Sequence, residues 1–494
     1  MVRNENTHRT NQRLPKRKRR WGLLLAFLVI VPVGWQDASG RDLGSEARAA
    51  LRRAVSYYRN QVAYRGGYLY YYREDLAQRW GEGEATPTQI WVQPPGTPTV
   101  GQAFVKAYEA TDDRFYLDAA DEAAQALIFG QLESGGWAHA IDFDPKGRRS
   151  GQYRNGRGRG KNYSTLDDDV SQAALRFLMS VDRAHDFKDK AIHEATLFGL
   201  EALLKAQFPN GGFPQVWSGP VKRHPIIKAS FPAYDWRSEN RIKEYWHLYT
   251  LNDNLAGDMA KTLILAHEVY DDPGYRDALT RLGDFLILAQ MPDPQPAWCQ
   301  QYTFEMKPAW ARKFEPPAIT SSESFDVLRA LMLIHGTTKD PKYLRPIPRA
   351  LAYFEKSLLP DGRLPRYLEL QTNRPLYMER KGKVYDLTYD DSNLPSHYAF
   401  KITPDLDRIR REFERLKNPQ PSSSPPTAKS LERKVTRILD NLDGQGRWLS
   451  TSKGEGLTGQ PKIKTGTRFL SSARFAKNVE LLSTYLRVLN EESE

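Results

Sequence analysis

The chain has 494 residues, of which 40% are hydrophobic and 27% charged, a composition typical of a globular protein with one large domain or several smaller ones. The formal net charge of +12 falls to about +6 without the basic first 40 residues, which suits an anionic ligand but excludes a dedicated nucleic-acid binder. A single cysteine, Cys299, excludes an intrachain disulfide.

The first 40 residues have the pattern of an export signal. Eight Lys and Arg residues precede the apolar stretch 21–35, and small residues follow at 38–40. The apolar stretch is short for a membrane-spanning helix. We therefore predict a signal peptide at 1–40 and a secreted or periplasmic protein, with a retained N-terminal membrane anchor as the alternative.

From about residue 43 onward the hydrophobic pattern is helical and repeats. The ranges 100–131, 187–207, 255–290 and 322–359 follow the order helix, short polar break, helix. In three of the breaks an aromatic residue follows the turn, and we expect these residues to pack between the paired helices: Phe115, Tyr275 and Tyr343. A second phrase, Gln-x-x-x-Gly-Gly-aromatic, occurs at 131–137 and at 207–213.

Repeated αα-hairpins predict an all-α fold, an (α/α) barrel or toroid in which helix ends and connecting loops build a concave cleft. An open solenoid is the structural alternative. We expect the toroid to span 41–417. A Pro/Ser-rich linker at 418–430 and a helical extension at 431–494 would follow, and the extension would pack on the toroid. We expect a monomer.

The range 144–163 is rich in Gly and Arg and is predicted to be a loop. Arg-Gly segments of this kind can bind RNA. This loop, however, leads directly into the acidic residues 167–169, so we favour a basic loop beside an anion-binding cleft and expect no nucleic-acid partner.

Two acidic segments come just before predicted helices. Asp167 and Asp168 belong to the first, and Asp253 to the second. Helix capping alone explains either one. Two such entries on the same side of a ring would instead converge on one cavity, where Asp and Asn oxygens suit Ca²⁺. No His or Cys spacing indicates zinc.

Four arginines lie among aromatic residues and prolines rather than along a helix face: Arg312, Arg366, Arg374 and Arg380. Arginines in such loops are suited to holding carboxylates. Nearby aromatic residues can stack on sugars, although most aromatic residues of a helical toroid belong to its core: Trp137, Phe213, Trp217, Trp310, Tyr367 and Tyr377.

The segments "GGWAHAIDF", "STLDDDVSQAALRF", "AQFPNGGFPQVW", "HLYTLNDNLAGDMAKTL" and "TNRPLYMERKGKV" resemble, in this order, the family 10 polysaccharide lyases, pectate lyases with an (α/α) toroid fold. The similarity runs from about 130 to 390. It implies that Asp167 and Asp253 bind Ca²⁺ and the substrate carboxylate. It also implies that Arg312 and Arg366 hold uronate carboxylates and that Arg380 is the catalytic base.

The implied activity is Ca²⁺-assisted β-elimination of polygalacturonate, in which a base removes the C5 proton and the C4 oxygen leaves. Arginine is normally charged, so an arginine base favours alkaline pH. Asp168 replaces a substrate-contacting Asn of the family, and Ala138–His139 replace a Pro–Lys pair. "LPSHYAF" at 394–400 takes the place of the final Gly-Tyr-x-Trp-Tyr segment. With these departures, the resemblance implies a divergent member of the family.

Three alternatives stay open. The Gln-x-x-x-Gly-x-Trp phrase also matches a repeat of triterpene cyclases, but Leu166 occupies a position where their acid motif needs Asp. A glycan-binding toroid without cleavage is the second alternative. The third is a glycoside hydrolase on the same barrel, which would use two carboxylic acids and make Arg380 dispensable.

Overall fold

The computed structural model describes residues 42–238, 242–418, 425–454 and 463–493, and Leu43–Glu494 form one compact unit. The export signal predicted at 1–40 lies outside the described residues. No helix in the described ranges is long and apolar enough to cross a membrane. The described residues form twelve α-helices: α1 (Leu43–Tyr57), α2 (Thr97–Thr111), α3 (Arg114–Phe129), α4 (Val170–Ala184), α5 (Lys190–Lys205), α6 (Leu255–Tyr270), α7 (Pro273–Ala289), α8 (Ser321–Thr338), α9 (Ile347–Lys356), α10 (Leu406–Lys417), α11 (Ala428–Asp440) and α12 (Ser472–Glu491).

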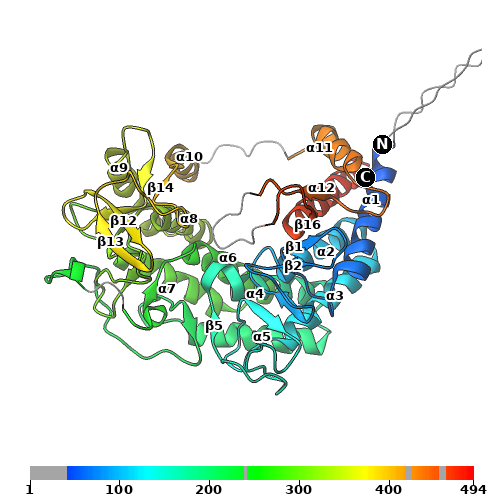
Figure 1. Ribbon diagram of the computed structural model, residues 1–494, viewed down its shortest axis with the longest axis horizontal. Helices are drawn as coiled ribbons and strands as arrows, with labels where there is room; N and C mark the ends of the chain where they lie inside the picture. The colour runs from blue at the N-terminus through cyan, green and yellow to red at the C-terminus, as the bar shows by residue number, and fades with distance from the viewer. Residues whose placement is uncertain (1–41, 239–241, 419–424, 455–462, 494) are drawn as a thin grey trace, which may run out of the picture. The chain divides into compact units, whose positions relative to one another are not determined.

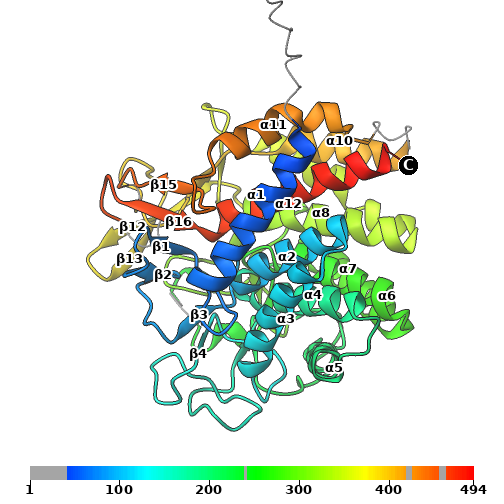
Figure 2. The ribbon, with the colours of Figure 1, turned by 90° about the vertical axis from the view of Figure 1, so that its right-hand side faces the viewer.

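The helices pack as pairs, and the pairs pack side by side (Figures 1 and 2). Helices α2, α4 and α6 pack on α3, α5 and α7, respectively. A continuous row of contacts runs through α12, α2, α4, α6, α8 and α10, and we call these helices the inner row. Helix α4 of this row is buried on nearly all sides, whereas its partner α5 buries one face and exposes charged residues on the other. The prediction of a mainly helical fold is confirmed.

Three helix pairs are joined by the same turn. The first helix ends at a residue in the left-handed conformation, and the side chain of the following Asp accepts a hydrogen bond from the backbone N–H two residues on. These residues are Asp112–Asp113, Asp271–Asp272 and Lys339–Asp340. Of the aromatic residues that follow, Tyr343 and Tyr275 are buried and Phe115 is half-buried.

The repeated Gln-Gly-Gly phrase fastens neighbouring pairs together. Gln131 Nε2 donates to the carbonyl oxygens of Gly135 and Ala195, both at 2.9 Å, and Ala195 belongs to α5. Gln207 Nε2 donates in the same way to Gly211 (3.1 Å) and to Ala278 of α7 (2.9 Å). The phrase therefore has a packing role in this fold.

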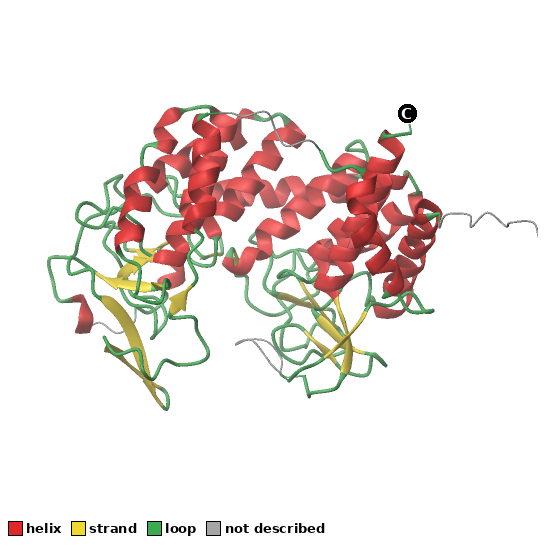
Figure 3. Cartoon of the chain, turned by 90° about the horizontal axis from the view of Figure 1, so that it is seen from above, coloured by secondary structure: helices red, strands yellow, loops and turns green. Residues whose placement is uncertain are grey.

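Short strands connect successive helix pairs and gather on one side of the helices (Figure 3). Strand β5 (Ser164–Thr165) pairs with β6 (Val216–Trp217), β7 (Tyr249–Thr250) with β8 (Gln301–Tyr302), and β9 (Ala318–Thr320) with β11 (Tyr367–Glu369), all antiparallel. Strands β5, β7 and β9 each come just before a helix of the inner row. Strands of two or three residues are too short to show an alternating pattern, so the sequence did not predict them.

Two larger antiparallel sheets have the strand orders β13–β12–β11–β9 and β15–β16–β1–β2. Strands β12 (Pro375–Lys381) and β13 (Val384–Thr388) form a hairpin, and β16 (Arg468–Ser471) pairs with β1 (Tyr71–Arg73). The other strands are β2 (Arg79–Trp80), β3 (Gln89–Trp91), β4 (Ala140–Asp142), β10 (Leu364–Pro365), β14 (Lys401–Ile402) and β15 (Leu449–Thr451). Helix α11 begins at Ala428, inside the predicted linker range, and packs with α12 on α1.

Candidate active site

Two connecting segments enter their helices through the same local structure. "TLDDD" at 165–169 leads into α4, and "TLNDN" at 250–254 leads into α6. In each copy the Thr hydroxyl accepts a hydrogen bond from the backbone N–H two residues later. Thr165 accepts from Asp167 at 3.1 Å, and Thr250 accepts from Asn252 at 3.2 Å. The next two residues of each copy are left-handed: Asp168, Asp169, Asp253 and Asn254. Asp and Asn tolerate this conformation, which explains their crowding here.

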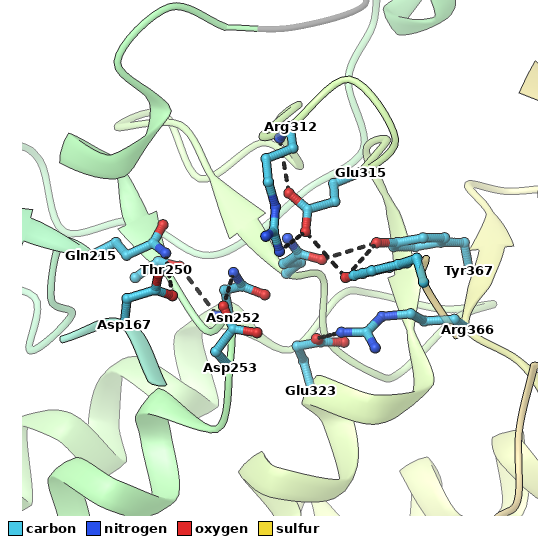
Figure 4. Close-up of polar contacts among 12 residues, drawn as sticks. Asp167, Gln215, Thr250, Asn252, Asp253, Arg312, Glu315, Glu323, Arg366 and Tyr367 are labelled. Carbon is cyan, nitrogen blue, oxygen red and sulfur yellow. Dashed lines mark hydrogen bonds and ion pairs between the residues drawn. The ribbon is translucent and has the colours of Figure 1, made fainter. Parts of the chain in front are cut away.

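The two copies bring three carboxylates together. Asp167, Asp168 and Asp253 each offer one oxygen, and these atoms lie within 4.8 Å of one another. Figure 4 shows Asp167 and Asp253 next to each other. Within the described chain, the residues that precede α4 and α6, Asp169 and Asn254, make no side-chain capping bond. The convergence of the two acidic segments is thus confirmed. Helix capping does not explain Asp167, Asp168 and Asp253, because their carboxylates accept hydrogen bonds from side-chain amides.

Burial and mutual repulsion act on this acidic triad. They raise the pKa of Asp253 well above its usual range. The residue Asp168 is exposed as a whole, but its carboxylate is partly enclosed by protein and lies near Asp167 and Glu82. Desolvation and these two charges raise the pKa of Asp168 to about 6. Three carboxylates this close need either shared protons or a cation.

Asp167 has the best-stabilised charge of the three. Burial opposes its ionisation, but hydrogen bonds from His139, Asp253 and Gln215 outweigh burial and lower the pKa of Asp167. Gln215 Nε2 donates to Asp167 Oδ1 at 2.6 Å, and His139 Nε2 lies 3.4 Å from Asp167 Oδ2. Although burial disfavours imidazolium, the neighbouring Asp167 raises the pKa of His139.

The donor set around the triad fits a hard divalent cation. Asn252 Nδ2 donates to Asp253 and Gln215 Nε2 to Asp167, so each amide group lies against the triad. The amide oxygens, Asn252 Oδ1 and Gln215 Oε1, are buried and have no hydrogen-bond partner in the described part of the chain. Carboxylate and amide oxygens are the ligands that Ca²⁺ prefers.

Two arginines lie on the other side of this region, each paired with a buried glutamate (Figure 4). Arg312 pairs with Glu315, and Arg366 with Glu323 at 2.5 Å; the glutamates are 1% and 2% exposed. Burial opposes the arginine charges, but the glutamates outweigh it and raise the pKa of both arginines. The Nε atom of each arginine is buried without a partner among the described residues.

Tyr398 lies between these arginines. Its ring centroid is 4.4 Å from the guanidinium carbon of Arg366 and 5.8 Å from that of Arg312. Its hydroxyl donates to Glu315 Oε1 at 3.1 Å and accepts from the Tyr367 hydroxyl at 3.3 Å. The divergent segment 394–400 therefore contributes to the site.

The other two candidate arginines make no contact with the triad among the described residues. Arg380 is exposed on β12, its Nε donates to the Gly382 carbonyl at 2.9 Å, and its guanidinium carbon is 5.7 Å from the Tyr385 ring centroid. The Tyr385 hydroxyl bonds to His397 Nε2 at 2.9 Å, and Phe314 packs on both rings. Arg374 is exposed and stacks on Tyr389, 3.5 Å from the ring centroid.

Sequence reasoning missed most of the residues that support the charged groups. His139, Gln215, Glu315, Glu323 and Tyr398 come from different connecting segments, and their local patterns do not distinguish them. The aromatic residues suggested as sugar platforms were a wrong choice, because all are at most 3% exposed: Trp137, Phe213, Trp217, Trp310, Tyr367 and Tyr377.

Comparison with known proteins finds a family model that matches the central part of the chain. Residues 131–364 match the model of the family described as pectic acid lyase, which confirms the resemblance seen in the sequence. The match includes the triad and Arg312 but ends before Arg366, Arg374 and Arg380. A search of curated proteins finds no match.

Several solved structures are similar at low identity. A family 10 polysaccharide lyase from Cellvibrio cellulosa is 19% identical, with a TM-score of 0.45 over 63% of this chain and 95% of that one. A mutant of the family 10 lyase from the same organism, in complex with trigalacturonic acid, is 18% identical, with a TM-score of 0.45 over 65% and 99%. D-mannose isomerase is 12% identical, with a TM-score of 0.44 over 90% and 98%.

Proposed function

We propose that this chain, whose residues 131–364 match the pectic acid lyases, is a polysaccharide lyase that cleaves polygalacturonate by Ca²⁺-assisted β-elimination. The observation that carries the proposal is the meeting of Asp167, Asp168 and Asp253 inside the matched range. We further propose that the row of inner helices belongs to an (α/α) toroid. The protein would be exported, as residues 1–40 predict, and act as a monomer on an anionic polysaccharide.

The chemistry fits the charges of the site. The C5 proton of a uronate is weakly acidic because it lies α to a carboxylate. Its removal turns the C5–H electron pair into a C4–C5 double bond and expels the C4 oxygen, which takes a proton from water. Neutralising the carboxylate makes the proton easier to remove. Ca²⁺ held by Asp167, Asp168 and Asp253 would supply part of that neutralisation.

Arg312 and Arg366 are suited to supply the remainder. Their charges are secured by Glu315 and Glu323, while each keeps a buried Nε–H group without a partner in the described chain. A guanidinium has five N–H donors, so a substrate carboxylate can accept from those that the glutamates leave unused. The glutamates therefore act as positioning residues that fix the direction of each guanidinium.

We assign the role of base to Arg380 on the family resemblance. A base must come within about 3 Å of the proton that it removes, and such contacts often tighten only when substrate is present. Arg380 is carried by the β12–β13 hairpin, next to the aromatic group of Phe314, Tyr385 and His397.

A glycan-binding protein without cleavage is the second candidate. The observation that favours it is the exposed position of Arg380, which has no contact with the triad among the described residues. In that case the triad and the two arginines would bind uronates, and no bond would break.

The test is the ultraviolet absorbance of unsaturated uronate while the purified protein acts on polygalacturonate at alkaline pH. We expect a rise that needs Ca²⁺, stops with EDTA and is lost in Arg380→Ala. Lys383→Ala is the matched control, because Lys383 is an exposed cation in the turn of the same hairpin and has no proposed role in the site. A flat trace with retained binding would support the binding protein, and new reducing ends without absorbance would indicate a hydrolase.

A further inference from the structure

We propose that the cavity under the Gly/Arg-rich loop 144–163 is a further subsite, which takes a second acidic sugar unit of the same polymer. The cavity has a volume of about 480 Å³. The loop contributes Arg148, Arg149 and Lys161 to its lining, and the segment before α6 contributes Tyr245 and Trp246. The identity of the polymer rests on the proposed function, whereas the charge of the unit rests on the cavity itself.

The cavity is continuous with the acidic triad. Asp167, Gln215 and His139 line it, and the same three residues form the hydrogen-bonded group described above. A polymer with one uronate at the triad can therefore place a neighbouring unit in this cavity without leaving the protein surface.

The cations of the cavity lack partners. Among the residues that the structure describes, Arg148, Arg149 and Lys161 form no ion pair. Arg154 of the same loop, which does not line the cavity, pairs with Glu194 at 2.6 Å. Cations without an ion pair that line a concavity are a ready site for an anion, because their N–H groups can still donate to an incoming carboxylate or sulfate.

Arg149 is the most constrained of these cations. Its guanidinium carbon lies 4.4 Å from the Trp91 ring centroid, and its Nε is buried without a hydrogen-bond partner in the described chain. Burial and the neighbouring Arg148 lower the pKa of Arg149, although the charges of Glu82 and Asp142 oppose the shift. Two like charges side by side are unfavourable alone, and an anion bound in the cavity that both arginines line would offset their repulsion.

The rest of the lining suits a sugar ring rather than a small inorganic anion. Trp246 is half-buried and Tyr163 is 41% exposed, so both present accessible ring surface. Lys161 Nζ lies 5.5 Å from the Tyr163 ring centroid, which places a charge beside that surface. Ring faces next to cations match the apolar face and the acid group of one uronate or sulfated sugar.

Two separate groups of cations are associated with the triad. Figure 4 shows Arg312 and Arg366 near Asp253. Arg148 and Arg149 line the cavity that Asp167 also lines. A polymer with one negative charge on each unit can use both sets at once. We therefore expect affinity to rise with the number of acidic units.

The experiment compares two double variants of the same loop. Arg148→Gln with Arg149→Gln removes two charges that line the cavity. Arg157→Gln with Arg159→Gln removes two charges from exposed positions that do not line it. The dissociation constants are measured by affinity electrophoresis in gels with polygalacturonate, dextran sulfate, which carries sulfate but no carboxylate groups, or fully methyl-esterified pectin.

We expect the cavity variant to weaken binding to the polyanion that the wild-type protein binds by roughly tenfold, since two charge-assisted contacts are lost. We expect the control variant to change it less than twofold and the esterified pectin to be bound weakly by all. Equal losses in both variants, or no loss in either, would overturn the subsite. The two anionic gels distinguish a carboxylate from a sulfate as the group that is bound.

Cleavage is measured separately, so the two proposals fail in different ways. If no uronan is cleaved but only the cavity variant loses binding, the subsite stands and the lyase proposal falls. If polygalacturonate is cleaved and the cavity variant binds hexagalacturonate as well as the wild type does, the lyase proposal stands and the subsite falls. Circular dichroism of both variants checks that each is folded.

Discussion

Asp168 and Asp253 occupy the same position in two copies of one turn, with φ angles of 46° and 50°. Each turn opens a helix of the inner row, and these helices, α4 and α6, pack side by side. Repetition of the helix pair therefore brings the two carboxylates together with Asp167. Glu323 lies near the start of α8, the next helix in the row, so a third repeat also contributes a residue to the site.

The first prediction concerns the cation. Asp253→Asn removes one carboxylate from the triad and should weaken Ca²⁺ binding at least about tenfold, measured by isothermal titration calorimetry. Asp169→Asn is the control, because Asp169 lies in the same acidic run but pairs with Arg176 instead. Equal affinities for the wild type and Asp253→Asn would show that the triad does not hold the ion.

The second prediction concerns the pH dependence of that binding. The pKa of Asp168 is raised to about 6 by desolvation and by the charges of Asp167 and Glu82. Asp168 therefore gains a proton as the pH falls through about 6, and Ca²⁺ affinity should fall with it. Asp168→Asn should bind more weakly at pH 7 and show a smaller change between pH 7 and 5. An identical pH profile in wild type and variant would contradict this.

The third prediction concerns stability and Asp326, which is buried in α8. Desolvation, aided by Asp258, raises the pKa of Asp326 to about 7, although the Gly257 N–H, Lys261 and Arg329 oppose the shift. The folded state thus binds more protons than the unfolded state between about pH 4 and 7. The free energy of unfolding should fall as pH rises through this window, by at most about 1.4 kcal/mol per pH unit.

Asp326→Asn keeps an acceptor for the Gly257 N–H and removes the titrating group. We expect its unfolding midpoint in urea to exceed that of the wild type at pH 8 and to be closer to it at pH 5. A variant that is less stable than the wild type at pH 8 would show that the Asp326 charge is compensated.

The fourth prediction tests the repeated Gly-Gly phrase. Gly211 has a φ of +94°, and a Cβ there would lie 1.8 Å from the Arg281 carbonyl oxygen of α7. Gly211→Ala should lower the free energy of unfolding by roughly 1–3 kcal/mol. Gly219→Ala, with no atom within 4 Å of its Cβ, should have little effect. Equal unfolding temperatures for the two variants would contradict this packing role.

The sequence predicted the helix pairs well because their signals are local. The left-handed residue and Asp at each turn, as at Asp112–Asp113, can be read from a few neighbouring residues. It also predicted that Asp167 and Asp253 converge, since both open helices of a repeat. It could not place Glu315, Glu323 or Tyr398, because their contacts join segments that are far apart in the chain. The strands that set those contacts have only two or three residues.

The most direct measurement is the mass of the products formed from polygalacturonate in water labelled with heavy oxygen, with Ca²⁺ present. We predict unsaturated products that are lighter by one water than the hydrolysis products and carry no label at the newly cleaved bond. Products with the full mass of hydrolysis and one heavy oxygen at each new reducing end would contradict the lyase proposal.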